Sequence, residues 1–200
     1  MMRFHYAGTY DGPDSLPRRE PLPAGAVAFR EPESAGAMGL IGNGLALAIF
    51  AVLYGLLVMR CGMAAFGYEA FLYGSLLTLL TMVPHEFIHA LCFRGDVYMY
   101  QALSKGLLFV VGTEDMTLAH FCLMSLLPAT VLGLIPYLAC MIVPNLTTLG
   151  VFGAMALASA AGDFLNVFNA VTQMPRGALT FLSGFHSYWY LPGSDEGRGA

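Results

Sequence analysis

Long apolar runs separated by short polar breaks dominate the chain. No charged residue occurs in the 26 positions between Glu33 and Arg60. Residues 40–59 alone, as a helix, are long enough to cross the roughly 30 Å core of a bilayer. Three further apolar segments follow at residues 66–93, 117–143 and 149–173. The pattern therefore predicts an all-α membrane protein with about four transmembrane helices.

Prolines mark where these apolar segments bend or end. Pro84 lies inside the second segment and has no N–H, which leaves the carbonyl four residues earlier unbonded. We therefore expect a bend at this point. Pro144 and Asn145 divide the third segment from the fourth.

Residues 94–115 form the main polar interruption between the apolar segments. Two β-prone runs, Val97–Tyr100 and Leu107–Val111, flank the turn Ser104-Lys105-Gly106, which is typical of a hairpin. The sequence thus predicts a short β-hairpin-like loop between the second and third helices. Such a loop is either a plain connector or an exposed strand edge onto which an extended peptide could add.

The two ends of the chain are more polar than its middle. Residues 1–38 hold five prolines and charges of both signs, so we expect a flexible cytosolic tail, with residues 26–30 extended along the membrane surface. Residues 39–175 form the predicted transmembrane domain. Residues 176–200 are aromatic and then polar, which favours a cytosolic or interfacial tail. No signal peptide is recognisable, so the first helix is expected to act as its own insertion signal.

Composition narrows the class of protein. The chain is 57% hydrophobic and 11% charged, which excludes an ordinary soluble domain and makes the lipid bilayer its expected environment. The Lys and Arg residues form no basic stripe and the net charge is −4, so nucleic acid is not an expected partner. The four cysteines lie in or beside apolar segments without Cys-x-x-Cys spacing. They are interpreted as apolar fillers, neither disulfides nor metal ligands.

The basic residues also predict an orientation in the membrane. With four helices and both termini in the cytosol, only Arg60 among the nine Lys and Arg residues lies outside. This excess follows the positive-inside rule. It predicts a multi-pass membrane protein with both termini cytosolic.

The second apolar segment ends in a His-Glu-x-x-His pattern formed by His85, Glu86 and His89. On a helix the two histidines lie one turn apart on one face, where they can bind a single Zn²⁺. Glu86 beside them can take a proton from water that the metal has acidified. Each of these groups costs about 2.5–3.5 kcal/mol to insert into a membrane helix, and a purely structural role leaves their clustering unexplained. We predict that His85 and His89 bind metal and that Glu86 is catalytic.

A catalytic zinc usually has three protein ligands, so a third is required. Asp163 is the first candidate, because it is the only acidic residue of the fourth segment and lies deep in an apolar run. The small residues at 153–162 would let that helix approach closely. Asn166, one turn further on, is a candidate to orient the carboxylate or to contact substrate. The alternative third ligands are His120, Glu114 and Asp115.

Two stretches resemble known metallopeptidases. His85-Glu86-x-x-His89 on one membrane helix with an Asp on a later one resembles the site-2-protease type of intramembrane zinc peptidase, although its Asn-x-x-Pro and Leu-Asp-Gly are absent here. The Pro-His-Glu-Phe-Ile-His-Ala stretch, the polar hairpin and Ala-Gly-Asp163-Phe-Leu-Asn166 are more similar to a small bacterial family described as putative zincin peptidases, over roughly residues 40–175. This resemblance implies Zn²⁺ held by His85, His89 and Asp163, Glu86 as catalytic acid/base, and a bacterial cytoplasmic membrane.

Together these features predict an intramembrane zinc metallopeptidase that hydrolyses membrane-protein or peptide substrates, with residues 39–175 as its metallopeptidase-like domain. Two other classes stay open. A metal-ion carrier could use the same His and Asp groups, but it should show further polar residues across the bilayer, and the outer halves of these helices have few. A catalytically inactive membrane scaffold that presents its hairpin to a partner would tolerate the loss of Glu86.

Overall fold

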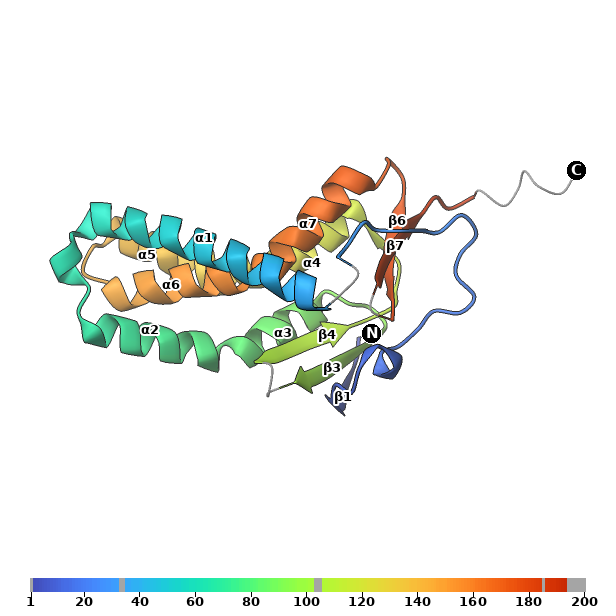
Figure 1. Cartoon of the computed structure of the whole chain (residues 1–200), viewed down its shortest axis with the longest axis horizontal. Coiled ribbons are helices and arrows are strands. Elements are labelled where there is room, and N and C mark those ends of the chain that lie inside the picture. The colour runs from blue at the N-terminus through green and yellow to red at the C-terminus, as the bar shows by residue number, and fades with distance from the viewer. Residues whose placement is uncertain (1, 33–34, 103–105, 185, 194–200) are drawn as a thin grey trace, which may run out of the picture. The chain divides into compact units, whose positions relative to one another are not determined.

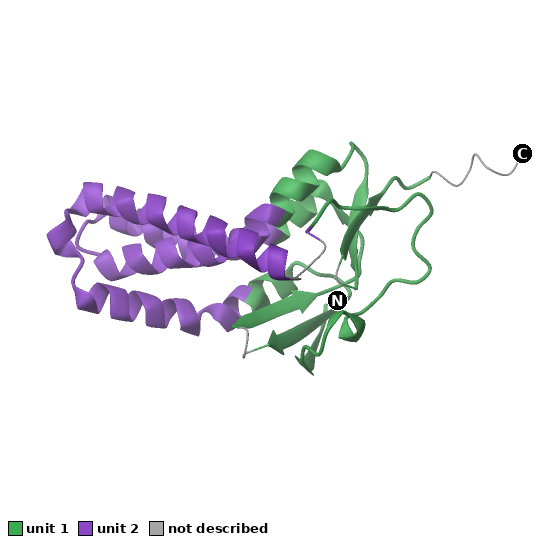
Figure 2. Cartoon of the chain, viewed as in Figure 1, with its two compact units in different colours: residues 1–31, 86–124, 166–200 green, residues 32–85, 125–165 purple. Residues whose placement is uncertain are grey.

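The computed structural model describes residues 2–32, 35–102, 106–184 and 186–193. The chain forms two compact units (Figure 2): unit 1 comprises residues 1–31, 86–124 and 166–200, and unit 2 comprises residues 32–85 and 125–165. Three helices contribute residues to both units, namely α3 (Met82–Leu91), α4 (Leu118–Pro128) and α7 (Ala161–Gln173).

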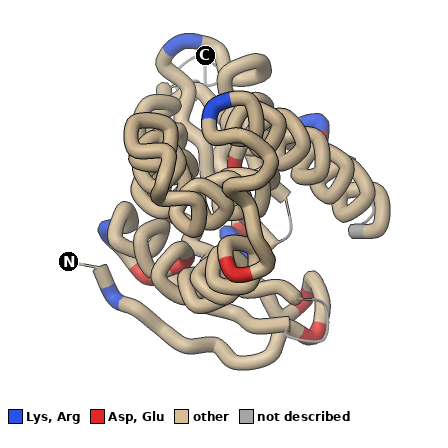
Figure 3. Tube along the Cα trace, turned by 90° about the vertical axis from the view of Figure 1, so that its left-hand side faces the viewer, with Lys and Arg blue, Asp and Glu red and all other residues tan. Residues whose placement is uncertain are grey.

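Unit 2 is built from helices and turns (Figure 1). Besides its parts of α3, α4 and α7, its elements are α1 (Ala35–Cys61), the 3-10 turn η2 (Met63–Ala65), α2 (Tyr68–Leu80), the π-helical segment η4 (Ala129–Leu134), α5 (Ile135–Ile142) and α6 (Thr147–Ser159). Figure 3 shows long stretches of helix without Lys, Arg, Asp or Glu. Such helices suit a lipid environment, where a charged side chain is costly.

The helices supply two to four candidate membrane spans. Two continuous stretches are long and apolar enough to cross a membrane: Gly36–Cys61 in α1, and Leu118–Ile142, which joins α4, η4 and α5. Two further pairs, α2 with α3 and α6 with α7, are apolar enough together but are bent by 41° and 48°. Among the described residues the count is therefore two, or four if each bent pair forms one span. The predicted number of about four agrees only with the second count.

Glycines let the helices of unit 2 pack closely. A Cβ on Gly153 of α6 would lie 2.5 Å from the backbone N of Tyr137 and 2.7 Å from the carbonyl O of Gly133. A Cβ on Gly74 of α2 would lie 2.8 Å from Cγ1 of Val151 on α6. Both distances are far shorter than a van der Waals contact, so the helices can pack this closely only because Gly153 and Gly74 have no Cβ.

Unit 1 contains a three-stranded sheet in the order β1-β3-β4. β1 (Arg3–Thr9) runs parallel to β3 (Asp96–Ala102), which runs antiparallel to β4 (Leu107–Val111). In the β3–β4 register, Tyr98 lies opposite Val111. This pairing confirms the predicted hairpin, although residues 104–105 of its predicted turn lie outside the described residues.

A second sheet of unit 1 has the order β2-β7-β6-β5. Its strands, all antiparallel to their neighbours, are β2 (Val27–Ala28), β5 (Met116–Thr117), β6 (Leu179–Ser183) and β7 (His186–Tyr190). The core of unit 1 contains buried apolar residues from the helices, from the strands and from the segments beside them, including Phe29, Ala90, Phe93, Val97, Met116, Phe121, Met124, Ala170 and Met174.

The structure corrects the prediction of an all-α protein, because in the described part of the chain seven strands accompany the helices. The segment 1–38, expected to be a flexible tail, contributes β1 and β2, and the expected interfacial tail after residue 175 contributes β6 and β7. β1 pairs with a strand almost ninety residues further along the chain, and Arg3 and His5 also bind the Asp96 carboxylate on β3. Local composition does not reveal a pairing over that separation.

Candidate metal centre

Helix α3, which carries His85, Glu86 and His89, begins directly after a bend. α2 ends at Leu80, and the axes of α2 and α3 differ by 41°. Between them, the Thr81 hydroxyl donates to the carbonyls of Leu77 at 2.8 Å and Thr78 at 3.0 Å. Pro84 lies in the first turn of α3, where a missing N–H is tolerated. The bend expected from Pro84 is thus confirmed, and it places His85 in the first turn of a new helix.

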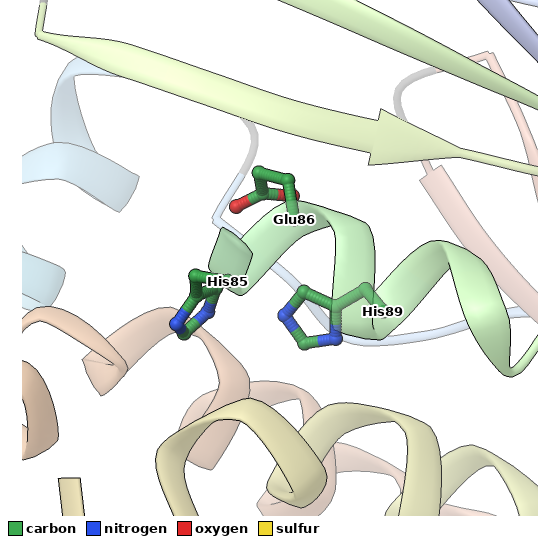
Figure 4. Close-up of side chains that lie close together, drawn as sticks. All are labelled: His85, Glu86 and His89. Atoms are coloured by element: carbon green, nitrogen blue, oxygen red, sulfur yellow. The ribbon is translucent and has the colours of Figure 1, made fainter. Parts of the chain in front are cut away.

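The three polar side chains of α3 lie close together. One possible ligand atom each from His85, Glu86 and His89 falls within 4.8 Å of the others. Figure 4 shows both imidazoles on the same side of the helix. His89 is buried, whereas His85 and Glu86 are partly buried. The i, i+4 spacing therefore presents two nitrogen donors from one helix face, as metal binding requires.

A backbone carbonyl fixes the orientation of the His89 ring. Nδ1 of His89 lies 2.8 Å from the carbonyl O of Met124 on α4. A carbonyl can only accept, so Nδ1 carries the proton in this hydrogen bond, and Nε2 is the nitrogen with a lone pair. Metal-binding histidines commonly have such a partner on the nitrogen that does not face the metal, because it fixes both tautomer and ring orientation.

Glu86 is bound to the hairpin of unit 1. The backbone N of Val110, in β4, donates to Oε2 of Glu86 at 3.1 Å. Because β4 pairs with β3 on its other side, this N–H projects from the outer edge of the sheet. The hydrogen bond thus connects the edge strand to the Glu86 carboxylate, which follows His85 in the motif.

Asp163 lies beside His85 within unit 2. It is in the first turn of α7, directly after the 48° bend that follows α6. Its Oδ2 lies 3.2 Å from Nε2 of His85, and both side chains are only 16% exposed. Two ligand atoms of one tetrahedral zinc, each about 2.0–2.1 Å from the metal, lie about 3.3 Å apart. The pair is therefore spaced as two donors to one ion would be.

Part of the chain matches a known protein family. Residues 78–179, more than half of the chain, match the model of the family described as putative zincin peptidase. The chain belongs to this family. The matched range includes the His-Glu-x-x-His motif, the β3–β4 hairpin and Asp163. No curated protein and no solved structure matches the chain.

The donors of this zincin peptidase family member are of the kind that zinc prefers. Imidazole nitrogen and carboxylate oxygen are both common zinc ligands, and catalytic sites of two histidines with one carboxylate are known. The family description implies zinc, and the His85, Glu86 and His89 group could hold a metal ion.

The other predicted candidates lie in different surroundings. The Glu114 carboxylate accepts hydrogen bonds from the backbone N of Arg94 and, at 2.7 Å, of Gly95. Nε2 of His120 is 2.8 Å from the carbonyl of Cys92, and Asp115 pairs with Arg19. The side chain of Asn166 is exposed. The three alternative third ligands therefore stabilise unit 1 through hydrogen bonds and an ion pair.

Two functional contacts had no signal in the sequence. The carbonyl of Met124 and the N–H of Val110 belong to the backbone, which every residue type carries. Only the fold determines which backbone groups face His89 and Glu86.

Proposed function

We propose that the chain is an intramembrane zinc metallopeptidase that cleaves peptide bonds of membrane-protein or peptide substrates. The observation that carries this proposal is the donor group of α3, with ligand atoms of His85, Glu86 and His89 within 4.8 Å of one another. It is supported by Asp163 beside His85, by the apolar candidate spans and by the family.

In this proposal His85, His89 and Asp163 hold the metal and Glu86 handles the proton. Zinc, when bound, lowers the pKa of water to about 7 and polarises the scissile carbonyl. Glu86 accepts the water proton at a carboxylate oxygen and passes it to the amide nitrogen as the peptide bond breaks. The Met124 carbonyl holds the His89 ring in place, and the bond from Val110 orients Glu86.

The outer edge of β4 is the proposed binding surface for substrate. Among the described strands β4 pairs only with β3, so no described strand pairs with its other edge, on which the Val110 N–H binds Glu86. Backbone groups alternate along a strand, so Leu108 presents its N–H and C=O on the same side as Val110. A substrate peptide pairing there becomes extended, which exposes the amides that a helix would hide. Asn166 is a further candidate contact.

The proposed location is a bacterial cytoplasmic membrane with both termini in the cytosol. With four spans, this orientation leaves Arg60 alone outside and follows the positive-inside rule. The basic residues on the cytosolic side would be Arg3, Arg18, Arg19, Arg30, Arg94, Lys105, Arg176 and Arg198.

The variant Glu86→Gln tests the catalytic assignment. It preserves the size of the side chain but cannot accept the proton, so zinc content should be unchanged while cleavage falls at least about 100-fold. Zinc is measured by elemental analysis of the purified full chain. Cleavage is measured by mapping new protein N-termini in membranes that contain wild type or variant.

His85→Ala is the paired variant, and it should lose both zinc and cleavage. Wild-type cleavage by the Glu86→Gln protein would rule out the assigned role of Glu86. A wild-type protein that binds zinc yet produces no new N-termini relative to Glu86→Gln would favour the inactive scaffold or the metal-ion carrier.

A further inference from the structure

Two cysteines from distant parts of the sequence lie side by side in unit 2. Cys61 is the last residue of α1, and Cys140 lies in α5. Their Sγ atoms are 3.9 Å apart. The sequence interpretation of the cysteines as separate apolar fillers does not account for this pairing.

Further contacts hold the same two helices together around the cysteines. The Tyr137 hydroxyl donates to the carbonyl of Leu53 at 3.0 Å. One residue from each cysteine, Nε of Arg60 donates to the carbonyl of Met141 at 2.9 Å. The α1 and α5 backbones beside the sulfurs are therefore fixed relative to each other. A disulfide needs an S–S separation of about 2.05 Å, so the two sulfurs must approach each other by about 2 Å.

We propose that Cys61 and Cys140 are a disulfide site that links α1 covalently to α5. The reaction is thiol–disulfide exchange with a disulfide-bearing oxidant of the cell envelope. One thiolate attacks a sulfur of the oxidant's disulfide and forms a mixed disulfide with it. The second thiolate then attacks the protein sulfur of this mixed disulfide, which forms the Cys61–Cys140 bond and releases the oxidant with two thiols. Each sulfur of the pair loses a proton and one electron, and both electrons reduce the oxidant.

The position of the pair along the spans makes this chemistry available. Cys61 ends the first candidate span and Cys140 lies two residues before the end of Leu118–Ile142. In the orientation proposed above both residues lie at the extracytoplasmic face, where disulfides form and persist. The oxidation of the two thiols in the cell therefore depends on the proposed orientation, whereas their proximity does not.

The consequence of the link falls on α1. In the most apolar stretch of α1 only 6% is buried, against 33% in that of the Leu118–Ile142 span. Most of α1 is therefore exposed on the surface of unit 2, and a covalent bond at its end would fasten it to α5. A glycine at 150 leaves room for the pair, since a Cβ there would lie 2.7 Å from Sγ of Cys140.

Thiol counting in cells tests the proposal. Membranes from cells that contain the full chain are quenched in acid, and free thiols of the denatured protein are labelled with a maleimide polymer before or after reduction. Wild type should show two labels without reduction and four with it. Cys61→Ser and Cys140→Ser should each show three labels in both conditions. The matched controls Cys92→Ser and Cys122→Ser should show one label and then three.

Reduced wild-type protein treated with oxidised glutathione in detergent separates the site from the orientation. If this treatment yields peptides joined by a Cys61–Cys140 disulfide, whereas the protein in cells has four free thiols, the result supports the disulfide site and contradicts the orientation. No 61–140 link in either experiment, or a disulfide that survives in Cys61→Ser, overturns the proposal. The labels of Glu86→Gln should equal those of wild type, so the result does not depend on peptidase activity.

Discussion

The two compact units are stabilised by different physical forces. The described part of unit 2 has only three Lys, Arg, Asp or Glu residues, namely Arg60, Glu69 and Asp163, and its helices meet through glycines. Unit 1 has two sheets, and ion pairs such as Arg3 with Asp96 join segments far apart in sequence. Unit 2 therefore depends on shape and apolar contact, whereas part of the tertiary structure of unit 1 depends on charge.

Because of this difference, a charged residue has different surroundings, and a different energetic cost, in each unit. In unit 1 carboxylates are more numerous, and several, such as Asp96 and Glu114, have a cation or a backbone N–H as a partner. In unit 2 a carboxylate is costly, and the partly buried one, Asp163, lies against an imidazole. Variants that remove a charge, a glycine or an ion pair should therefore have separate effects.

The largest effect is expected from Asp163→Ala. If Asp163 is a metal ligand, its loss should reduce zinc affinity by more than the 10–100-fold that removing a hydrogen-bond partner of a ligand typically costs. Zinc affinity is measured by competition with a chelator on the purified full chain. Glu69→Ala is the matched control, because Glu69 also lies in the first turn of a helix of unit 2 but is exposed. Equal affinities of the two variants would remove Asp163 from the metal site.

A smaller effect, on stability, is expected from Gly153→Ala. The added methyl would lie 2.5 Å from the Tyr137 backbone, so α6 and α5 must separate, at a cost of about 1–3 kcal/mol. Gly55→Ala in α1 meets nothing within 4 Å and should cause no loss. The midpoint of thermal unfolding in detergent distinguishes them. If both variants unfold like wild type, close helix packing does not limit the stability of unit 2.

The same contrast explains how much of the fold could be predicted from the sequence. Hydropathy is a local property, so the apolar helices of unit 2 and the bend near Pro84 were predictable. The β3–β4 hairpin is also local and was found. The pairing of β1 with β3 joins distant residues, so composition alone suggested a flexible tail. The β6–β7 hairpin did have a signal, an aromatic β-prone run interrupted by Gly184, but the run was interpreted as a membrane-interface segment.

For the candidate site, the sequence supplied the residue types but not their surroundings. The His-Glu-x-x-His spacing identified His85, Glu86 and His89, whose grouping needs only a helix. The proximity of Asp163 to His85 depends on a second bend after Ser159, which no proline marks. Glu114 and His120 bind backbone groups that only the fold brings near them.

The smallest effect is expected from the ion pair of unit 1. Hydrogen bonds from Arg3 and then His5 lower the pKa of Asp96 below its usual value. The folded-state pKa lies below that of the unfolded chain, so the stabilisation is present above the unfolded value of about 3.9 and is lost as pH falls through the folded pKa. Acid should therefore loosen β1 from β3 in wild type but have less effect in Asp96→Asn, where the attachment is already weaker.

Backbone chemical shifts of Tyr6 and Gly8 in β1, followed from neutral to acid pH, measure this attachment. High salt should reduce the difference between wild type and Asp96→Asn, because the Arg3 side chain is largely exposed and its charge is screened. Asp14→Asn is the control, since among the described residues Asp14 pairs with Arg18, four residues away, in place of a residue on another strand. Identical acid transitions in wild type and Asp96→Asn would show that backbone pairing alone holds β1, so unit 1 would then depend on charge no more than unit 2 does.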